Sequence, residues 1–168
     1  PHNVYTTSDK LDALNASKGY TTSTFTGFTR KDSVAAKTPT ATSISVHISS
    51  ALYDGSYAYN ATTNTYDRSE DGQPHLDRES GQISPRVVIV MKIPERTVLE
   101  DGYREQIDAI GSGQATIFQD GTVQQVTWSK ASMTDQINFT AAAGKDVPVA
   151  RGQTWLTSIP ESGGVTWK

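Results

Sequence analysis

The sequence contains no cysteine, which excludes thiolate catalysis, cysteine-ligated zinc and iron–sulfur clusters. It also lacks an excess of basic residues, since 15 Lys and Arg against 18 Asp and Glu give a formal net charge of −3. A nucleic-acid-binding protein needs a basic surface to displace counterions from phosphates, so we expect no nucleic acid among the partners. No apolar run approaches the roughly 20 residues that span a bilayer.

Helix patterns are scarce as well. With 168 residues the chain is long enough for one domain with a sizeable core. Ser8 is a suitable N-cap and Gly19 a suitable stop, which together predict a helix over 8–18. A stretch rich in Thr, Ser and Lys follows it and is typical of a linker. We therefore divide the sequence into an N-terminal helix and linker, 1–42, and a β-rich domain, 43–168.

A β pattern covers most of the remaining sequence. The strongest strand prediction is 87–93, a nearly continuous apolar run that we expect to be buried on both faces. Asp120-Gly121 lies between two alternating runs and predicts a hairpin, because both residues tolerate the positive φ of a two-residue turn. Further strands are expected over 43–48, 57–59, 65–66, 136–140, 153–159 and 165–167. The predicted fold class is mainly β or α+β, an antiparallel or mixed sheet with one N-terminal helix.

An acidic, turn-rich segment between residues 64 and 80 is the strongest candidate for a functional site. Its five acidic and two basic residues give it a formal charge of −3, equal to that of the whole chain. Gly72 and Pro74 indicate a loop, and loops on rigid sheets commonly hold functional groups. Elsewhere, Trp155 and Trp167 could contribute to a carbohydrate platform, whereas Trp128 ends an apolar strand face and is expected in the core.

The acidic segment admits three functional interpretations and a structural one. His75 and Asp77 are two residues apart, so in an extended segment both could bind one divalent metal, with Asp71 or a distant residue as the third ligand. Alternatively, His75 is a general base oriented by Asp77 or Asp71. In the third interpretation, Arg68 binds a carboxylate or phosphate while Tyr66 stacks on a sugar. In the structural one, Arg68 pairs with neighbouring carboxylates and His75 caps a turn.

Short motifs along nearly the whole chain resemble those of the YerB-like bacterial lipoproteins. They are Pro1-His2-Asn3, Tyr66-Asp67-Arg68, Asp71-Gly72, Pro74-His75-Leu76-Asp77, Gly81-Gln82-Ile83, Gly111-Ser112-Gly113 and Gly152-Gln153-Thr154-Trp155. The resemblance implies an exported protein held at the membrane by a lipid anchor outside this chain, with an N-terminal domain upstream. Residues 1–42 would then be the tail of that upstream domain, and His2 joins the ligand-binding candidates.

Two functional hypotheses follow from these residues and from the resemblance. The first is a non-catalytic, extracytoplasmic domain of the cell envelope that binds a partner, such as an envelope protein, or a wall-derived ligand, such as a cell-wall glycan. The second is a hydrolase or transferase acting on envelope glycans or phosphodiesters. There His75 would be the base, Asp77 would orient it and Arg68 would stabilise negative charge. We expect no cofactor, and we expect the upstream N-terminal domain as a partner.

Overall fold

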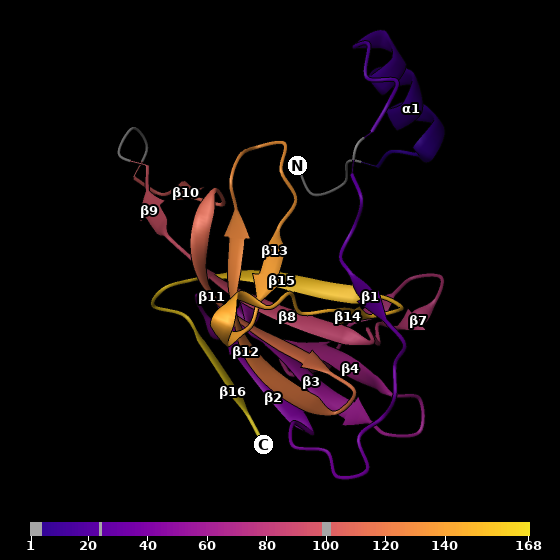
Figure 1. Ribbon diagram of the computed structural model, residues 1–168, viewed down its shortest axis with the longest axis vertical. Coiled ribbons are helices and arrows are strands. Elements are labelled where there is room, and N and C mark those ends of the chain that lie inside the picture. Colours follow the sequence, from indigo (N-terminus) through magenta and orange to yellow (C-terminus); the bar gives the residue numbers. More distant parts are fainter. Residues whose placement is uncertain (1–4, 24, 99–101) are drawn as a thin grey trace.

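The computed structural model describes residues 5–23, 25–98 and 102–168, and most of them form a β body of two five-stranded sheets (Figure 1). The first sheet, in spatial order, consists of β13 (Asn138–Thr140), β12 (Thr122–Lys130), β11 (Gly111–Gln119), β8 (Val87–Ile93) and β15 (Thr154–Pro160). The second consists of β16 (Gly164–Trp167), β2 (Ser43–His47), β3 (Gly55–Asn60), β4 (Thr65–Glu70) and β5 (Gln73–Pro74). Neighbouring strands are antiparallel except for β8 and β15, which are parallel. The predicted mainly β class with mixed sheets is confirmed.

Three short strand pairs lie at the margins of these sheets. They are β1 (Arg30–Lys31) with β14 (Val149–Ala150), β6 (Leu76–Asp77) with β7 (Gly81–Gln82), and β9 (Glu95–Thr97) with β10 (Glu105–Ile107). Two 3₁₀ turns, η1 (Ala51–Tyr53) and η2 (Ala142–Gly144), complete the secondary structure of the described residues. The β6–β7 pair follows directly after β5 and, as described below, borders the candidate site.

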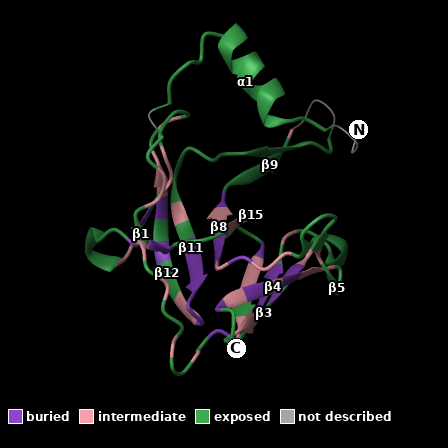
Figure 2. Cartoon of the chain, turned by 90° about the vertical axis from the view of Figure 1, so that its right-hand side faces the viewer, coloured by how far each residue is buried: buried purple, intermediate pink, exposed green. Residues whose placement is uncertain are grey.

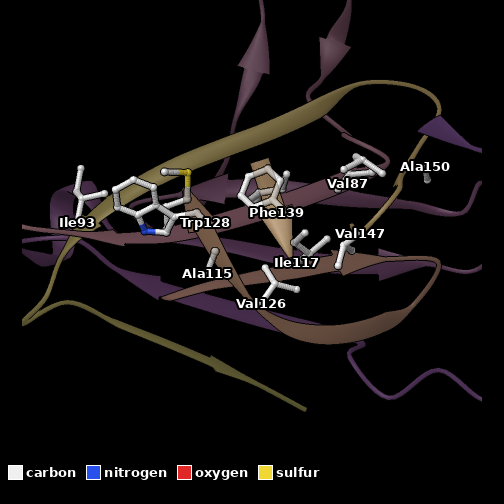
Figure 3. Packing of buried hydrophobic residues seen from close by; sticks show 12 residues of the cluster. Val87, Ile93, Ala115, Ile117, Val126, Trp128, Phe139, Val147 and Ala150 are labelled. Carbon is white, nitrogen blue, oxygen red and sulfur yellow. The ribbon is translucent and has the colours of Figure 1, made fainter. Parts of the chain in front are cut away.

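Strand β8 is the centre of the hydrophobic core. Val88 and Val90 point toward the second sheet, whereas Val87, Ile89 and Met91 point to the opposite side, where β12, β13 and the segment before β14 cover them (Figure 3). All five side chains are buried. Since an apolar side chain on each face needs its own cover, the nearly unbroken apolar run is explained by this position between two layers. The prediction for 87–93 is confirmed.

Trp128 closes one end of the cluster drawn in Figure 3. It is fully buried, and its indole Nε1–H donates to the Lys92 carbonyl at 2.7 Å. Gly113 is its cross-strand neighbour, and a Cβ atom added there would lie 2.7 Å from that indole nitrogen. Glycine is therefore required beside the ring, and the expectation that Trp128 belongs to the core is confirmed.

The helix α1 (Ser8–Ser17) forms where the sequence predicts it, but it packs on nothing in the described chain. Thr7, one residue before the expected Ser8, is the N-cap, and Gly19 follows the helix with φ 75°. Every residue of α1 is exposed, including Leu11 and Leu14, and the helix projects away from the β body (Figure 2). No helix in the described ranges is long and apolar enough to cross a membrane.

The segment after α1 is attached to the β body from Thr26 onward, where the Thr26 hydroxyl donates to Gln136 Oε1 at 3.1 Å. Phe28 packs on Phe139 with ring centroids 5.5 Å apart, and β1 pairs in parallel with β14. Further along, the backbone N–H groups of Thr40 and Ala41 donate to the carbonyl of Gly121 at 2.9 and 3.0 Å. The predicted linker therefore includes a stretch that forms a regular part of the fold.

Candidate functional site

The candidate site is built on two consecutive small hairpins. Asp71 and Gly72 form the two-residue turn between β4 and β5, with φ 48° and 68°, as the left-handed region requires. The chain then returns alongside β4, because the His75 N–H donates to the Arg68 carbonyl and the Ile83 N–H to the His75 carbonyl, both at 3.0 Å. These backbone hydrogen bonds bring residues 68, 75 and 83 together although they are up to 15 positions apart.

Arg68 is the buried centre of the site. It is only 5% exposed, and its Nη1 donates to Glu70 Oε2 at 3.0 Å. The guanidinium carbon lies 4.3 Å from the centroid of the Trp155 ring and 5.9 Å from that of Tyr57, so the cation packs against two aromatic rings. Its Nε is buried without a hydrogen-bond partner. The arginine fixes the position of Trp155 from within the fold.

His75 completes what we call the Arg68 cluster: Arg68, Glu70, His75 and Trp155. Its Nδ1 contacts Arg68 Nη1 and lies 3.3 Å from Glu70 Oε2, while its ring meets Trp155 edge-on at 5.7 Å. A guanidinium has only donors, so Nδ1 can take part in this contact only as an acceptor. The carboxylate beside His75 is thus Glu70, not Asp71 or Asp77.

Asp77 and Asp71 both occupy turns. Asp77 Oδ1 accepts from the backbone N–H groups of Ser80 at 2.6 Å and Glu79 at 3.0 Å, and these bonds hold the pKa of Asp77 below its ordinary value. Asp71 is exposed at the β4–β5 turn. Among the described residues, no group of three or more His, Asp or Glu side chains is arranged to hold a metal ion.

A further candidate, Tyr66, is not part of this arrangement. Tyr66 is fully buried, and its hydroxyl accepts from the Gly121 N–H at 3.0 Å. Burial raises the pKa of Tyr66 well above its ordinary value. This side chain packs in the core and is not available to stack on a sugar. His2 lies outside the described residues.

A cleft of about 410 Å³ opens beside the Arg68 cluster; we call it the Trp155 cleft. The β6–β7 hairpin contributes Asp77, Ser80 and Gln82 to its lining, and the start of β15 with its preceding residue contributes Gln153, Thr154 and Trp155. The Gln82 amide nitrogen donates to the carbonyls of Arg68 at 2.7 Å and Ile83 at 3.0 Å, which fixes the amide. The lining combines the Trp155 indole and the apolar side chains of Ile83 and Pro85 with amide, hydroxyl and carboxylate groups, which suits a small molecule with both apolar and polar parts.

Sequence reasoning missed two members of this arrangement. Glu70 could have been found, because residues two apart on a strand share a face and Arg68 precedes it by two. Gln82 stands in a motif of the family resemblance, but nothing in the sequence indicates that its amide joins two strands to the cleft.

A second polar cluster lies at the Asp120-Gly121 hairpin turn, and we call it the Asp120 cluster: Lys31, Ser33, Asn64 and Asp120. Asp120 is 5% exposed; it accepts from Lys31 at 2.7 Å, Ser33 at 2.6 Å and Asn64 at 3.1 Å. Burial raises the pKa of Asp120, but these three hydrogen bonds outweigh it and lower the pKa overall. The cluster joins the segment after β1 to the body.

The two sheets form a two-layer β domain, and the Trp155 cleft lies beside its β6–β7 hairpin, next to the buried arginine. Residues 44–156 match the C-terminal domain of DUF3048, a protein family of unknown function, and the chain belongs to this family.

A relative and a solved structure agree with this assignment and with the resemblance stated above. The chain is 26% identical over 168 residues to "Putative lipoprotein YerB" of Bacillus subtilis (strain 168), covering 96% of this chain and 49% of that protein. The crystal structure of the YerB protein from Bacillus subtilis matches 99% of this chain and 56% of that one, with a TM-score of 0.77 at 23% identity. That likeness concerns the fold. The chain spans about half the length of the relative it matches.

Proposed function

We propose that this chain is a non-catalytic binding domain of an extracytoplasmic lipoprotein, and that it binds a cell-wall fragment in the Trp155 cleft. The name of the relative supports an envelope location. The observation that carries the proposal is the cleft itself, in which an indole held from within by a buried arginine stands beside fixed polar groups. Binding sites gain affinity when such groups are fixed before the ligand arrives.

The catalytic alternative has less support. It requires Asp77 to orient His75 and Arg68 to meet a substrate anion. Asp77 instead bonds to the backbone of its own turn, and the Arg68 side chain is only 6% exposed beneath Trp155. A general base needs a substrate proton within hydrogen-bond reach, and an electrostatic stabiliser must reach the developing charge. Binding therefore accounts for the buried arginine better than catalysis does.

We also propose that the end carrying α1 contacts the upstream domain that the family resemblance implies. Leu11 and Leu14 on the helix are exposed, as are Ile107 and Ile110 in and beside the β9–β10 hairpin. Both elements project from the same end of the β body (Figures 1 and 2). Apolar side chains gathered at one end are typical of an interaction surface. The division of the chain into the tail of an upstream domain, residues 1–42, and a β-rich domain, residues 43–168, is part of the same proposal.

Calorimetric unfolding with soluble cell-wall fragments tests the binding proposal. A ligand at 100 times its Kd adds about 2.7 kcal/mol to the free energy of unfolding. We expect this stabilisation in the wild type and a much smaller one in Trp155→Phe. Trp167→Phe is the matched control, because Trp167 is also partly buried but lies on β16, outside the cleft. The proposal is wrong if no wall fragment stabilises the wild type, or if both variants lose the effect equally.

A further inference from the structure

The polar groups that the β6–β7 hairpin holds in place at the Trp155 cleft present acceptors to a ligand. Asp77 has only acceptor oxygens when ionised, and its low pKa keeps it so. The Gln82 amide nitrogen already donates to backbone carbonyls, which leaves its carbonyl oxygen as the group that a ligand can use. The Ser80 hydroxyl bonds to Asp77. Gln153 and Thr154 also line the cleft and can donate from an amide and a hydroxyl, so the Asp77 carboxylate is the feature that favours a cation here.

Basic residues also lie near the cleft, and each has a partner elsewhere. Arg86, next to the lining residue Pro85, donates to the Ser33 hydroxyl at 3.4 Å. Arg68 pairs with Glu70 beneath Trp155, and Arg78 pairs with Glu79 at 3.0 Å on the exposed turn. Arg30 donates to the Ala150 carbonyl at 3.1 Å and to the Thr154 hydroxyl at 3.4 Å. No basic residue stands among the lining residues. The Asp77 carboxylate is therefore the one charged group among the residues that line the cleft.

Resting on the proposed function, we infer that the ligand is a saccharide bearing a protonated primary amine, with the ammonium group at Asp77 and the sugar ring beside Trp155. The carboxylate and the amide oxygen accept from the ammonium and hydroxyl groups, and the indole covers the apolar C–H face of the ring. A volume of about 410 Å³ lies within the range of small-molecule sites, roughly 300–1,000 Å³.

Titration calorimetry with three matched oligosaccharides tests this inference. The probes are a β-1,4-linked glucosamine tetramer, its fully N-acetylated counterpart and a galacturonic acid tetramer, at mildly acidic pH. We expect the glucosamine tetramer to bind about ten- to a hundredfold more tightly than the acetylated one, since a hydrogen bond between two charged groups is lost on acetylation. The galacturonic acid tetramer should not bind.

Asp77→Asn identifies the group responsible. Asparagine retains an oxygen that can accept from the Ser80 and Glu79 N–H groups, so the turn is preserved while the charge is removed. We expect this variant to bind the glucosamine tetramer about tenfold or more weakly, with an unchanged circular dichroism spectrum. Glu79→Gln is the control, because this exposed carboxylate stands on the same turn outside the lining; its binding should change less than about twofold.

The outcomes separate this inference from the proposed function. Equal affinity for the acetylated and the free-amine tetramers, or tighter binding of the acidic one, would overturn the amine while leaving a saccharide site in place. Unchanged binding in Asp77→Asn would also overturn it. Failure of every probe, together with failure of wall fragments to stabilise the protein, would overturn both.

Discussion

The Arg68 cluster and the Asp120 cluster lie at hairpin turns of the same kind, yet they differ in how completely the buried charge is hydrogen-bonded. Each turn is an Asp-Gly pair with positive φ at both residues. In the Asp120 cluster the buried carboxylate has three donors. In the Arg68 cluster the buried guanidinium has Glu70 and His75 beside it but keeps an unpartnered Nε. We call the Asp120 cluster saturated, because its buried charge is fully hydrogen-bonded, and it stabilises the fold. We call the Arg68 cluster unsaturated, because one buried N–H lacks a partner, and it supports the wall of the Trp155 cleft.

The first prediction concerns the saturated cluster and has the largest expected effect. Asp120→Ala leaves the Lys31, Ser33 and Asn64 donors without their acceptor, so we expect a loss of about 3 kcal/mol in the free energy of unfolding, measured by urea denaturation. Asp71→Ala is the matched control, because it makes the same substitution at the same turn position without those partners. Its loss should be about 1 kcal/mol, from the positive φ alone. Equal losses would show that the Asp120 cluster adds nothing beyond the turn.

The second prediction concerns the unsaturated cluster. Arg68→Leu removes the cation that packs on Trp155 and Tyr57 but introduces no buried unpaired group, since Glu70 is partly exposed. We expect a loss of about 1–2 kcal/mol in stability together with at least about tenfold weaker binding of wall fragments. Asp120→Asn should leave binding unchanged. If Arg68→Leu binds as tightly as wild type, the guanidinium does not hold the cleft.

The third prediction separates the clusters by pH. The pKa of Asp120 is lower in the folded protein than its unfolded value of about 3.9, so its ionisation stabilises the fold above that pH. The contribution decreases as the pH falls through the folded pKa. The difference in unfolding free energy between wild type and Asp120→Asn should therefore be full near neutral pH and shrink below about pH 4. A difference that stays constant down to about pH 2 would contradict the assignment.

The smallest effect is expected for His75→Gln. The imidazole is about one-third exposed, and glutamine can still accept from Arg68, so stability should fall by less than about 1 kcal/mol. Turnover of envelope substrates should not depend on this residue. An activity in the full-length protein that disappears with His75→Gln while folding is retained would favour the catalytic alternative instead.

Hydrophobic periodicity and turn residues predicted those elements whose contacts lie within a few residues along the chain. The apolar run of β8 and the Asp120-Gly121 turn predict their elements, because periodicity and turn chemistry act over a few residues. The parallel pairing of β15 with β8 has no such marker, since it joins segments about 65 residues apart through backbone hydrogen bonds. For the same reason the Trp155 cleft was not predicted as a unit. The attachment of residues 30–42 combines backbone hydrogen bonds with the Lys31 and Ser33 contacts to Asp120, and no sequence pattern indicates these distant partners.

The central claim, that the unsaturated cluster supports a binding site, is tested most directly by an ¹H–¹⁵N NMR titration with soluble wall fragments. The three indole N–H groups report on different places: Trp155 in the cleft, Trp128 in the core and Trp167 on β16. We predict that the Trp155 indole and the amides of Ser80 and Gln82 shift with ligand, while Trp128 and Gly121 stay constant. Shifts centred on the Asp120 cluster, or no shifts at saturating ligand, would contradict the claim.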